Sequence, residues 1–276
     1  MTNSSDPVRQ RYAMSGILER VAAFLQECGV DPERPNYEDF FPFDQLHGRG
    51  IQATREHIER AGIKSGMHVL DLGCGVGGSS RVIAAKCGCR VTGIDLTPQY
   101  IEVARELTRR CGMADCIEFQ QANALDLPFA NDTFDHVWCH NVTMNIEDKR
   151  TLASEVARVL KRGGRFSCSE LGQGPGGPLI FPLPWATDAS ASFLVMPETM
   201  RQALEYGDLR IIEQIDLSEA NLAFSREVRA RTERGEPPLN ATYVIMGDDF
   251  GERLMNVGRC AMEKRVVEHF MLAEKA

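Results

Sequence analysis

The sequence predicts an α/β protein built on a Rossmann-like, doubly wound sheet of mostly parallel strands. Short apolar segments alternate with amphipathic ones from His68 to about residue 170, which is the pattern of parallel strands joined by helices. A glycine-rich loop follows the first of these segments, and polar residues follow the later ones. Because ligands bind at the carboxyl ends of the strands in such sheets, these loops favour the same fold.

Residues 1–60 precede the alternation, and we expect them to form a helical cover. The segment "GILERVAAFLQECG" repeats apolar residues at helical spacing. A break rich in proline and aromatic residues, "DPERPNYEDFFPFDQLHGRG", separates it from a second helix, "IQATREHIERAG". The chain is therefore divided into an N-terminal cover (1–60) and a larger domain (61–276).

Five strands and three helices are expected in the first part of the larger domain. The strands are the short apolar segments "HVLDLG", "RVTGIDL", "CIEFQQAN", "FDHVWCH" and "GRFSCSEL". The helices between them are "GSSRVIAAKCG", "TPQYIEVARELTRRCG" and "EDKRTLASEVARVLKRGG". Thr97 and Pro98 suit the start of a helix, whereas Gly88 and Gly163 suit helix ends.

The alternation stops after Leu171. Residues 172–197 are rich in glycine, proline and aromatic residues, and they are too apolar for a solvated linker, so we expect an ordered cap over a site. A helix ("PETMRQALEYG") and a sixth strand ("LRIIEQIDL") follow. Two further helices, over 218–235 and about 240–262, lead to a last strand in "KRVVEHFML".

Composition narrows the class of partner. The formal net charge of −8 disfavours nucleic acid, because a nucleic-acid binder needs a basic face. The nine cysteines include no C-x-x-C pair, which predicts reduced thiols and no metal site. No apolar run reaches about 18 residues and the N-terminus lacks an apolar signal core, so we expect a cytoplasmic protein without a membrane span. A homodimer formed through residues 236–262 is compatible with the sequence.

The loop "GCGVGG" after the first strand decides between classes of ligand. It lacks the lysine of a P-loop, which excludes that kind of triphosphate site. It matches the G-x-G-x-x-G of dinucleotide-binding folds, with Asp95 18 residues after Gly77 as the expected ribose-binding carboxylate, so a nicotinamide-dependent oxidoreductase stays an alternative. Asp71, two residues before the first glycine, would repel a pyrophosphate. It suits S-adenosylmethionine, which carries an ammonium, a sulfonium and a ribose but no phosphate.

Four stretches in order support this interpretation: "VLDLGCGVGG", "VTGIDLTPQYIEVAR", "QANALDLPFANDTFDHVWC" and "VLKRGGRF". Over roughly residues 67–170 the chain resembles class I S-adenosylmethionine-dependent methyltransferases. The flanking stretches "FDQLHGRGIQATREHIERAGI" and "PWATDASASFLVMPETMRQAL" are similar to a small-molecule subgroup near the sarcosine/dimethylglycine N-methyltransferases and the ubiquinone/menaquinone C-methyltransferases. The resemblance implies a small-molecule acceptor with a nitrogen, oxygen or carbon nucleophile, and a seventh, antiparallel edge strand in "VVEHFML".

The resemblance also implies which residues hold the cofactor. Asn123 stands where the family usually has Asp, and it keeps an acceptor oxygen for the adenine amino group but loses the charge. The implied contacts are Asp71, Gly73, Gly75 and the backbone of His140 for the methionine part, Asp95 and Leu96 for the ribose and adenine edge, and Asn123 and Ala124 for the adenine.

Methyl transfer needs little catalytic chemistry from a protein. The sulfonium methyl is a strong electrophile, so in-line displacement, which leaves S-adenosylhomocysteine, mainly requires an acceptor aligned about 3 Å away and the exclusion of water. A general base helps only a protonated or weakly nucleophilic acceptor, and Glu170, His47 and His140 are the candidates, each with a structural role as the alternative. The candidates for acceptor binding are Asn141, Asn145, Phe181, Trp185, Phe193 and Tyr12. A non-catalytic module that binds S-adenosylmethionine is the other interpretation of the same motifs.

Overall fold

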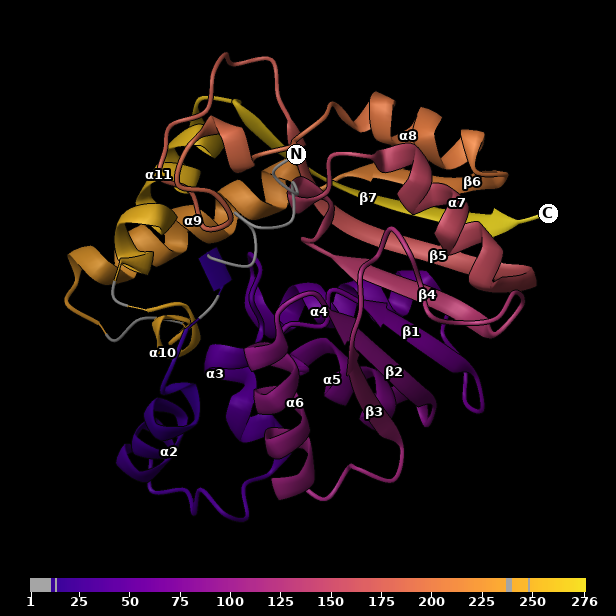
Figure 1. The fold of residues 1–276 in the computed structure, drawn as a ribbon. Coiled ribbons are helices and arrows are strands. Elements are labelled where there is room, and N and C mark those ends of the chain that lie inside the picture. Colours follow the sequence, from indigo (N-terminus) through magenta and orange to yellow (C-terminus); the bar gives the residue numbers. More distant parts are fainter. Residues whose placement is uncertain (1–10, 13, 237–239, 248) are drawn as a thin grey trace.

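A seven-stranded sheet forms the centre of the protein (Figure 1). The computed structural model describes residues 11–12, 14–236, 240–247 and 249–276. The strands are β1 (His68–Leu72), β2 (Arg90–Asp95), β3 (Ile117–Gln121), β4 (Phe134–His140), β5 (Leu160–Gln173), β6 (Leu209–Asp216) and β7 (Val266–Lys275). Their order in the sheet is β3-β2-β1-β4-β5-β7-β6. The strand order reverses between β1 and β4, which confirms the predicted doubly wound sheet.

The position of β7 differs from the expected edge strand. β7 runs antiparallel between β5 and β6 and pairs with both of them, so the edges of the sheet are β3 and β6. β6 is parallel to β5 but lies one position away, and β7 fills the gap. The expectation of an edge strand was wrong because this central position gives both backbone edges of β7 hydrogen-bond partners. It also buries Phe270 and Met271 completely.

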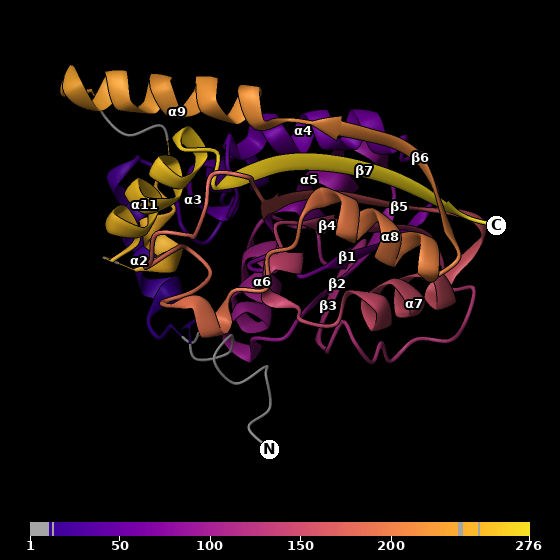
Figure 2. The same ribbon diagram turned by 90° about the horizontal axis from the view of Figure 1, so that it is seen from above.

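Helices cover both faces of the sheet. They are α4 (Gly50–Ala61), α5 (Gly78–Cys87), α6 (Pro98–Arg110), α7 (Lys149–Val159) and α8 (Pro197–Tyr206). On one face, α4, α5 and α6 share a core with Trp138 of β4. On the other face, α7 and α8 pack around Val137, the neighbour of Trp138 in the same strand, since successive side chains of a strand point to opposite faces. Figure 2 shows α4 and α5 on one side of the strands and α7 and α8 on the other.

The N-terminal cover packs against the C-terminal part of the chain. Its elements are α2 (Ile17–Glu27), the 3₁₀ helix η1 (Tyr37–Phe40) and α3 (Phe41–Asp44). The apolar face of α2, with Val21 and Leu25, shares a core with Val244 and Ile245. These two residues belong to α10 (Tyr243–Met246). The first ten residues of the expected cover lie outside the described residues, and the division at residue 60 stays a prediction.

In the segment after β6, the described residues form three helices rather than the expected two. They are α9 (Ser218–Glu233), α10 and α11 (Phe250–Met262). Gly247, with a φ of 89°, ends α10, because a side chain is disfavoured in that backbone conformation. The proposed dimer segment 236–262 includes residues outside the described ones, and the homodimer stays a prediction. In Figure 2, α9 and α11 lie together at one end of the molecule, beyond the strands.

Hydrogen bonds fix the segment after β5 over this same end of the molecule. It contains one short 3₁₀ helix, η3 (Ala189–Ala191). The Nζ of Lys149 donates to the carbonyl oxygens of Thr143 and Phe193, both at 2.8 Å, and this fixes the segment to the loop after β4. Trp185 is 2 % exposed, and its indole Nε1 donates to Ser192 Oγ at 2.9 Å. These bonds fix the segment to its neighbours, and its role as a cap over a site stays a prediction.

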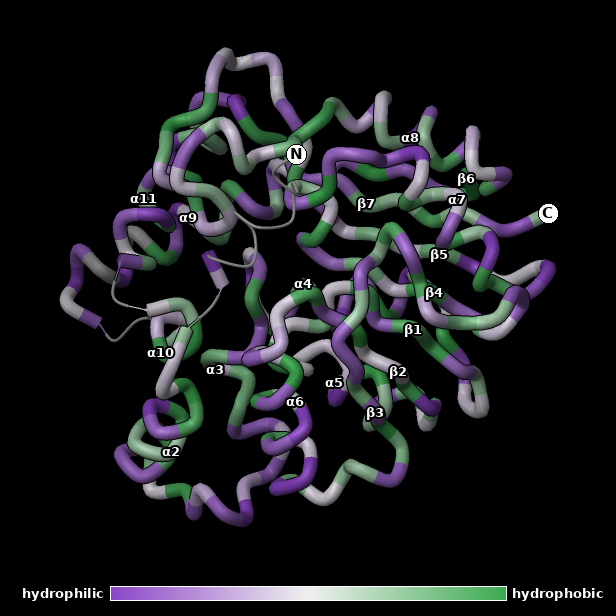
Figure 3. The backbone as a smooth tube through the Cα atoms, in the orientation of Figure 1, coloured by the Kyte–Doolittle hydropathy of each residue, from purple (hydrophilic) through white to green (hydrophobic). Residues whose placement is uncertain are grey.

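Hydropathy follows this arrangement. In Figure 3, the central strands β1 and β4 are mostly hydrophobic, whereas the surface helices alternate in colour along their length. Within the described part of the chain, no helix has both the length and the apolar character of a membrane span. The nine cysteines are free thiols, and no group of ligands suitable for a metal ion occurs among the described residues.

Candidate active site

A cavity of about 760 Å³ opens at the carboxyl ends of β1, β2 and β4. This volume lies within the range of small-molecule sites. Twelve of the residues singled out from the sequence line it: Tyr12, His47, Gly73, Gly75, Asp95, Leu96, Asn123, Ala124, His140, Asn141, Asn145 and Trp185. Asp71, Glu170, Phe181 and Phe193 do not belong to its lining. The topology therefore brings most of the candidate residues to one place.

The glycine loop leaves room for a ligand because Gly73 and Gly75, which line the cavity, carry no side chains. Gly73 has a φ of 74°, and a Cβ placed on it would lie 2.5 Å from Cγ2 of Val142. The backbone N–H groups of Gly73 and Cys74 both donate to the carbonyl oxygen of Ile94 at 2.8 Å. The loop is thus pinned to the end of β2, and an alanine at position 73 would not fit it.

Asp95 stands at the rim of the cavity with its carboxylate held on both oxygens. Its Oδ2 accepts from the Gly75 N–H at 3.0 Å, and its Oδ1 accepts from the Thr97 N–H at 2.8 Å. Burial raises the pKa of Asp95, and these backbone donors oppose that shift. Thr97 occupies the N-cap of α6 without a side-chain cap bond. The aspartate itself therefore orients the start of this helix, and it presents a preorganised acceptor pair to the cavity.

Asp71 lies beneath the loop instead of facing the cavity. Its side chain is 2 % exposed, and its Oδ2 accepts a hydrogen bond from the Ser80 hydroxyl at 2.5 Å. Burial and then the nearby Asp95 carboxylate raise the pKa of Asp71 to about 7. This placement supports a role in holding the start of α5 under the loop, and it does not support the direct ligand contact expected from the sequence.

Asn123 and Ala124 form a turn at the far end of the cavity. The Asn123 Oδ1 accepts from the Leu125 N–H at 3.0 Å, and the backbone of Asn123 bridges to Asp126. The side-chain oxygen still has a second lone pair for a ligand. The departure from aspartate thus keeps an acceptor at this position.

Two histidines stack at the edge of the cavity. The rings of His47 and His140 lie 3.7 Å apart, at an interplanar angle of 8°. His47 also contacts Thr54 Oγ1 through its Nε2 at 3.0 Å. Burial lowers the pKa of His47 to about 4, and it lowers the pKa of His140 as well. Both rings are therefore neutral near pH 7, which suits a wall beside a cationic ligand.

Glu170 ends in a buried pocket of hydrogen-bond donors behind the loop after β4. Its side chain has no exposure. The carboxylate accepts from the N–H groups of Val142 and Thr143 at 3.0 Å and from the Thr143 hydroxyl at 2.9 Å. The Cys139 thiol donates to its other oxygen at 3.2 Å. With these partners and no place in the cavity lining, Glu170 is positioned to support the loop, and its placement argues against the general-base role.

The predicted aromatic wall is only partly present. Trp185 lines the cavity. Phe181 packs in the core around Leu183 and Trp185, and Phe193 serves through its backbone, which donates to the Met144 carbonyl at 2.9 Å. Neither phenylalanine reaches the cavity lining, so a three-sided aromatic box is not formed by these residues.

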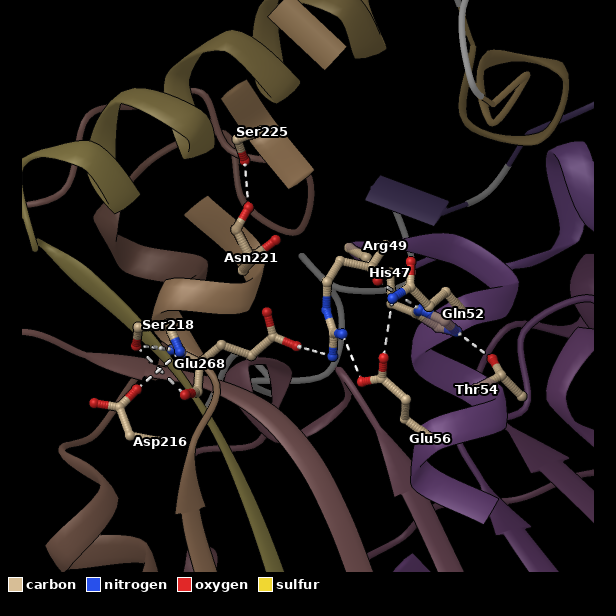
Figure 4. A network of polar contacts seen from close by, with 11 residues as sticks. His47, Arg49, Gln52, Thr54, Glu56, Asp216, Ser218, Asn221, Ser225 and Glu268 are labelled. Carbon is tan, nitrogen blue, oxygen red and sulfur yellow. Dashed lines mark hydrogen bonds and ion pairs between the residues drawn. The ribbon is translucent and has the colours of Figure 1, made fainter. Parts of the chain in front are cut away.

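A carboxylate that the sequence analysis missed lines the cavity from β7 (Figure 4). Glu268 is 5 % exposed, and its Oε1 lies 3.9 Å from Nη2 of Arg49. Arg49 is held in turn by Glu56, with Nη1 and Oε2 2.6 Å apart. Burial raises the pKa of Glu268 to about 7. The signal in the sequence was an acidic residue inside the apolar run "VVEHFML".

Comparison with known sequences finds a matching family and related proteins over much of the chain. A family described as a methyltransferase domain matches residues 70–168. A methyltransferase of Streptomyces halstedii is 36% identical over 128 residues, which cover 46% of this chain and 46% of that protein. An O-methyltransferase of Pyrenophora dematioidea is 30% identical over 188 residues, or 68% of each chain. The chain thus spans about half the length of the first relative and two thirds of the second.

Solved structures share the fold. A phosphoethanolamine N-methyltransferase of Haemonchus contortus superposes with a TM-score of 0.76 at 19% identity, over 100% of this chain and 60% of that one. A geranyl diphosphate C-methyltransferase of Streptomyces coelicolor superposes with a TM-score of 0.71 at 18% identity, over 100% and 98%. At these identities the likeness concerns the fold.

Proposed function

The chain belongs to the class I S-adenosylmethionine-dependent methyltransferase family, and from this premise we propose that it transfers a methyl group from S-adenosylmethionine to a small-molecule acceptor. The observation that carries the proposal is the pairing of the glycine-rich loop with the anchored Asp95 carboxylate at the rim of one cavity. That carboxylate offers acceptors for a ribose diol. The loop offers backbone and space but no phosphate-binding lysine.

The charges around the cavity suit this cofactor. Among the described residues that line the cavity, Arg226 is the one lysine or arginine. It is an exposed side chain 3.4 Å from the carboxylate of Glu219. The neutral histidine pair, His47 and His140, and the carboxylates of Asp95 and Glu268 also line the space. A wall of neutral rings and carboxylates favours a sulfonium, whereas a pyrophosphate would meet repulsion there.

In the proposed reaction, this chain binds the cofactor, orients the acceptor and shields both from water. S-adenosylmethionine supplies the methyl group as a strong electrophile. Asp95 and the turn at Asn123 hold the nucleoside, and the loop at Gly73 and Gly75 leaves space for the methionine part. The stacked His47 and His140 and the cap residue Trp185 exclude water. The acceptor is aligned in the remaining space, and this alignment is the main source of rate enhancement.

Calorimetric titration with S-adenosylhomocysteine tests the proposal. We expect wild-type protein to bind it, and Asp95→Ala to bind at least about tenfold more weakly, since hydrogen bonds to a charged group are lost. Asp216→Ala is the matched control, because it removes a carboxylate from the carboxyl end of β6, outside the cavity lining. No binding by folded wild-type protein, or equal binding by Asp95→Ala, would overturn the proposal.

Two alternatives give different results in the same experiments. A nicotinamide-dependent oxidoreductase would bind NADH in place of S-adenosylhomocysteine, and NADH fluorescence reports that directly. A non-catalytic module would bind S-adenosylhomocysteine but yield no methylated product from S-adenosylmethionine with a broad panel of amines, phenols and activated carbon acids. The net charge of −8 also favours a small-molecule acceptor over nucleic acid.

A further inference from the structure

The part of the cavity away from the glycine loop is lined mainly by apolar side chains. α9 contributes Leu222 and Phe224, and α11 contributes Leu254, Met255 and Met262. Met255 and Met262 are 71 % and 56 % exposed, so they lie at the mouth. Exposed apolar side chains gathered around an opening are typical of ligand-binding grooves as well as of protein interfaces, and here they border a cavity. The body of the acceptor is therefore expected to be apolar.

Glu268 interrupts this apolar surface from β7, as Glu233 does from the end of α9. The backbone of Glu268 is fixed, because its N–H donates to Ser218 Oγ at 3.0 Å and its carbonyl oxygen accepts from the Leu217 N–H at 2.8 Å. Its Oε1 faces Arg49 at 3.9 Å. Its Oε2 is buried and has no hydrogen-bond partner among the described residues. Figure 4 shows the carboxylate between Arg49 and the start of α9.

We propose that the free oxygen of Glu268 binds the polar head of the acceptor, and that this head is a hydrogen-bond donor, an amine or a hydroxyl, on an apolar skeleton. This inference rests on the proposed function and names its class of substrate. A buried carboxylate oxygen without a donor is costly. An acceptor that supplies an N–H or O–H there removes that cost and is oriented by the bond it makes.

The charges around Glu268 select against an anionic head. Arg49 carries one positive charge, and it is shared with Glu56, whose Oε2 lies 2.6 Å from Nη1. Asp216 adds a further negative field, and the Arg49 guanidinium opposes it. With the three carboxylates ionised, this group is net negative. A carboxylate or phosphate in the acceptor would be repelled, whereas an ammonium or a neutral donor would not.

Three probes with one apolar tail test the head group: octylamine, 1-octanol and octanoate. Each is titrated into protein saturated with S-adenosylhomocysteine, and calorimetry gives the affinity. We expect octylamine to bind at least about tenfold more tightly than octanoate, with octanol between them. Glu268→Gln should weaken the binding of octylamine by at least about tenfold, since a charge-assisted bond is lost. It should also reduce the discrimination against octanoate. If octylamine binds more tightly than octanol, the head of the acceptor is an ammonium, and if octanol binds more tightly, it is a hydroxyl.

Glu56→Gln is the matched control. It removes a carboxylate that contacts the same guanidinium but does not line the cavity, so the preference for octylamine over octanoate should survive. The inference is overturned if wild-type protein binds none of the three probes, if it prefers octanoate, or if the two variants lose the preference alike. Saturation with S-adenosylhomocysteine separates these results from the proposed function, whose failure would appear as a lack of binding in that first step.

Discussion

Replacing Glu170 by glutamine distinguishes a carboxylate that supports a loop from one that acts on a substrate. Oε2 accepts from the N–H groups of Val142 and Thr143 and from the Thr143 hydroxyl, at 2.9 to 3.0 Å. Oε1 accepts from the Cys139 thiol and, at 3.1 Å, from the Val142 N–H. All of these partners are donors. For the NH₂ group of an amide in the place of Oε1, the Val142 N–H cannot accept and the Cys139 sulfur is only a weak acceptor.

The expected cost follows from this mismatch. With its oxygen in the place of Oε2, the glutamine at position 170 turns its NH₂ toward the Val142 N–H, and an unpaired buried donor costs about 1–3 kcal/mol. The three remaining bonds lose the charge of their acceptor, at roughly 0.5 kcal/mol each. Burial raises the pKa of Glu170, and a neutral side chain avoids part of the desolvation cost. The sum is a loss of about 2–3 kcal/mol in the free energy of unfolding.

Equilibrium unfolding in urea, followed by tryptophan fluorescence, measures the loss. Thr143→Val removes the hydroxyl donor and completes a double-mutant cycle with Glu170→Gln. The two costs should not add, because Thr143→Val removes a bond that Glu170→Gln weakens. Glu213→Gln on the edge strand β6 is the control and should change the free energy by less than about 0.5 kcal/mol. A Glu170→Gln protein as stable as wild type, or strict additivity with Thr143→Val, would refute the role in loop support.

Three further changes follow from the geometry. Gly73→Ala places a Cβ 2.5 Å from Val142 at a positive φ, and calorimetry should show S-adenosylhomocysteine binding at least about tenfold more weakly; unchanged affinity would contradict this. Arg81→Met leaves the Asp44 carboxylate, 3.0 Å from Arg81 Nη2, buried and unpaired. Urea unfolding should show a loss of about 3–5 kcal/mol in the free energy of unfolding. Most of this loss should be recovered when Asp44→Asn is added, and an Arg81→Met protein as stable as wild type would contradict the prediction. Burial lowers the pKa of His136 to about 3, whereas a histidine in the unfolded chain titrates at about 6.5. The neutral ring therefore makes its full contribution to the free energy of unfolding above about pH 6.5. This contribution falls by about 2 kcal/mol from pH 7 to pH 5, because the unfolded chain takes up a proton there and the folded chain does not. His136→Gln should reduce the slope of the unfolding free energy against pH in this range, and an unchanged slope would count against this explanation.

The sheet, and the gathering of polar residues at one cavity, could be predicted because they depend on local pattern. Strands and helices alternate with clear periods, and several polar residues of the cavity stand at the ends of strands or directly after them. Asp95 is an example, since it is the last residue of β2 and its carboxylate points back to the loop at Gly75. Position in the sequence was sufficient there, because the carboxyl end of a parallel strand is always at the ligand edge.

The same reasoning fails where the direction of a side chain decides. Asp71 and Glu170 both lie near the carboxyl end of a strand, yet Asp71 meets Ser80 beneath the loop and Glu170 meets the N–H groups of the next loop. Successive residues of a strand point to opposite faces. The sequence does not show which buried donors lie on either face. The donor to Asp71 comes from the next helix, nine residues on, and the Thr143 donor to Glu170 comes from the loop 27 residues before it.

The acceptor end of the site was hidden for a topological reason. Because β7 is antiparallel, its first residues and not its last lie at the ligand edge, and Glu268 pairs with Leu171 near the carboxyl end of β5. α11 precedes β7, so it ends at the same edge and brings its apolar residues to the mouth of the cavity. A parallel strand in this position would have carried Glu268 to the opposite end of the sheet. In the proposed function, the placement of this one strand thus assigns the cofactor to the first half of the chain and the choice of acceptor to the last third.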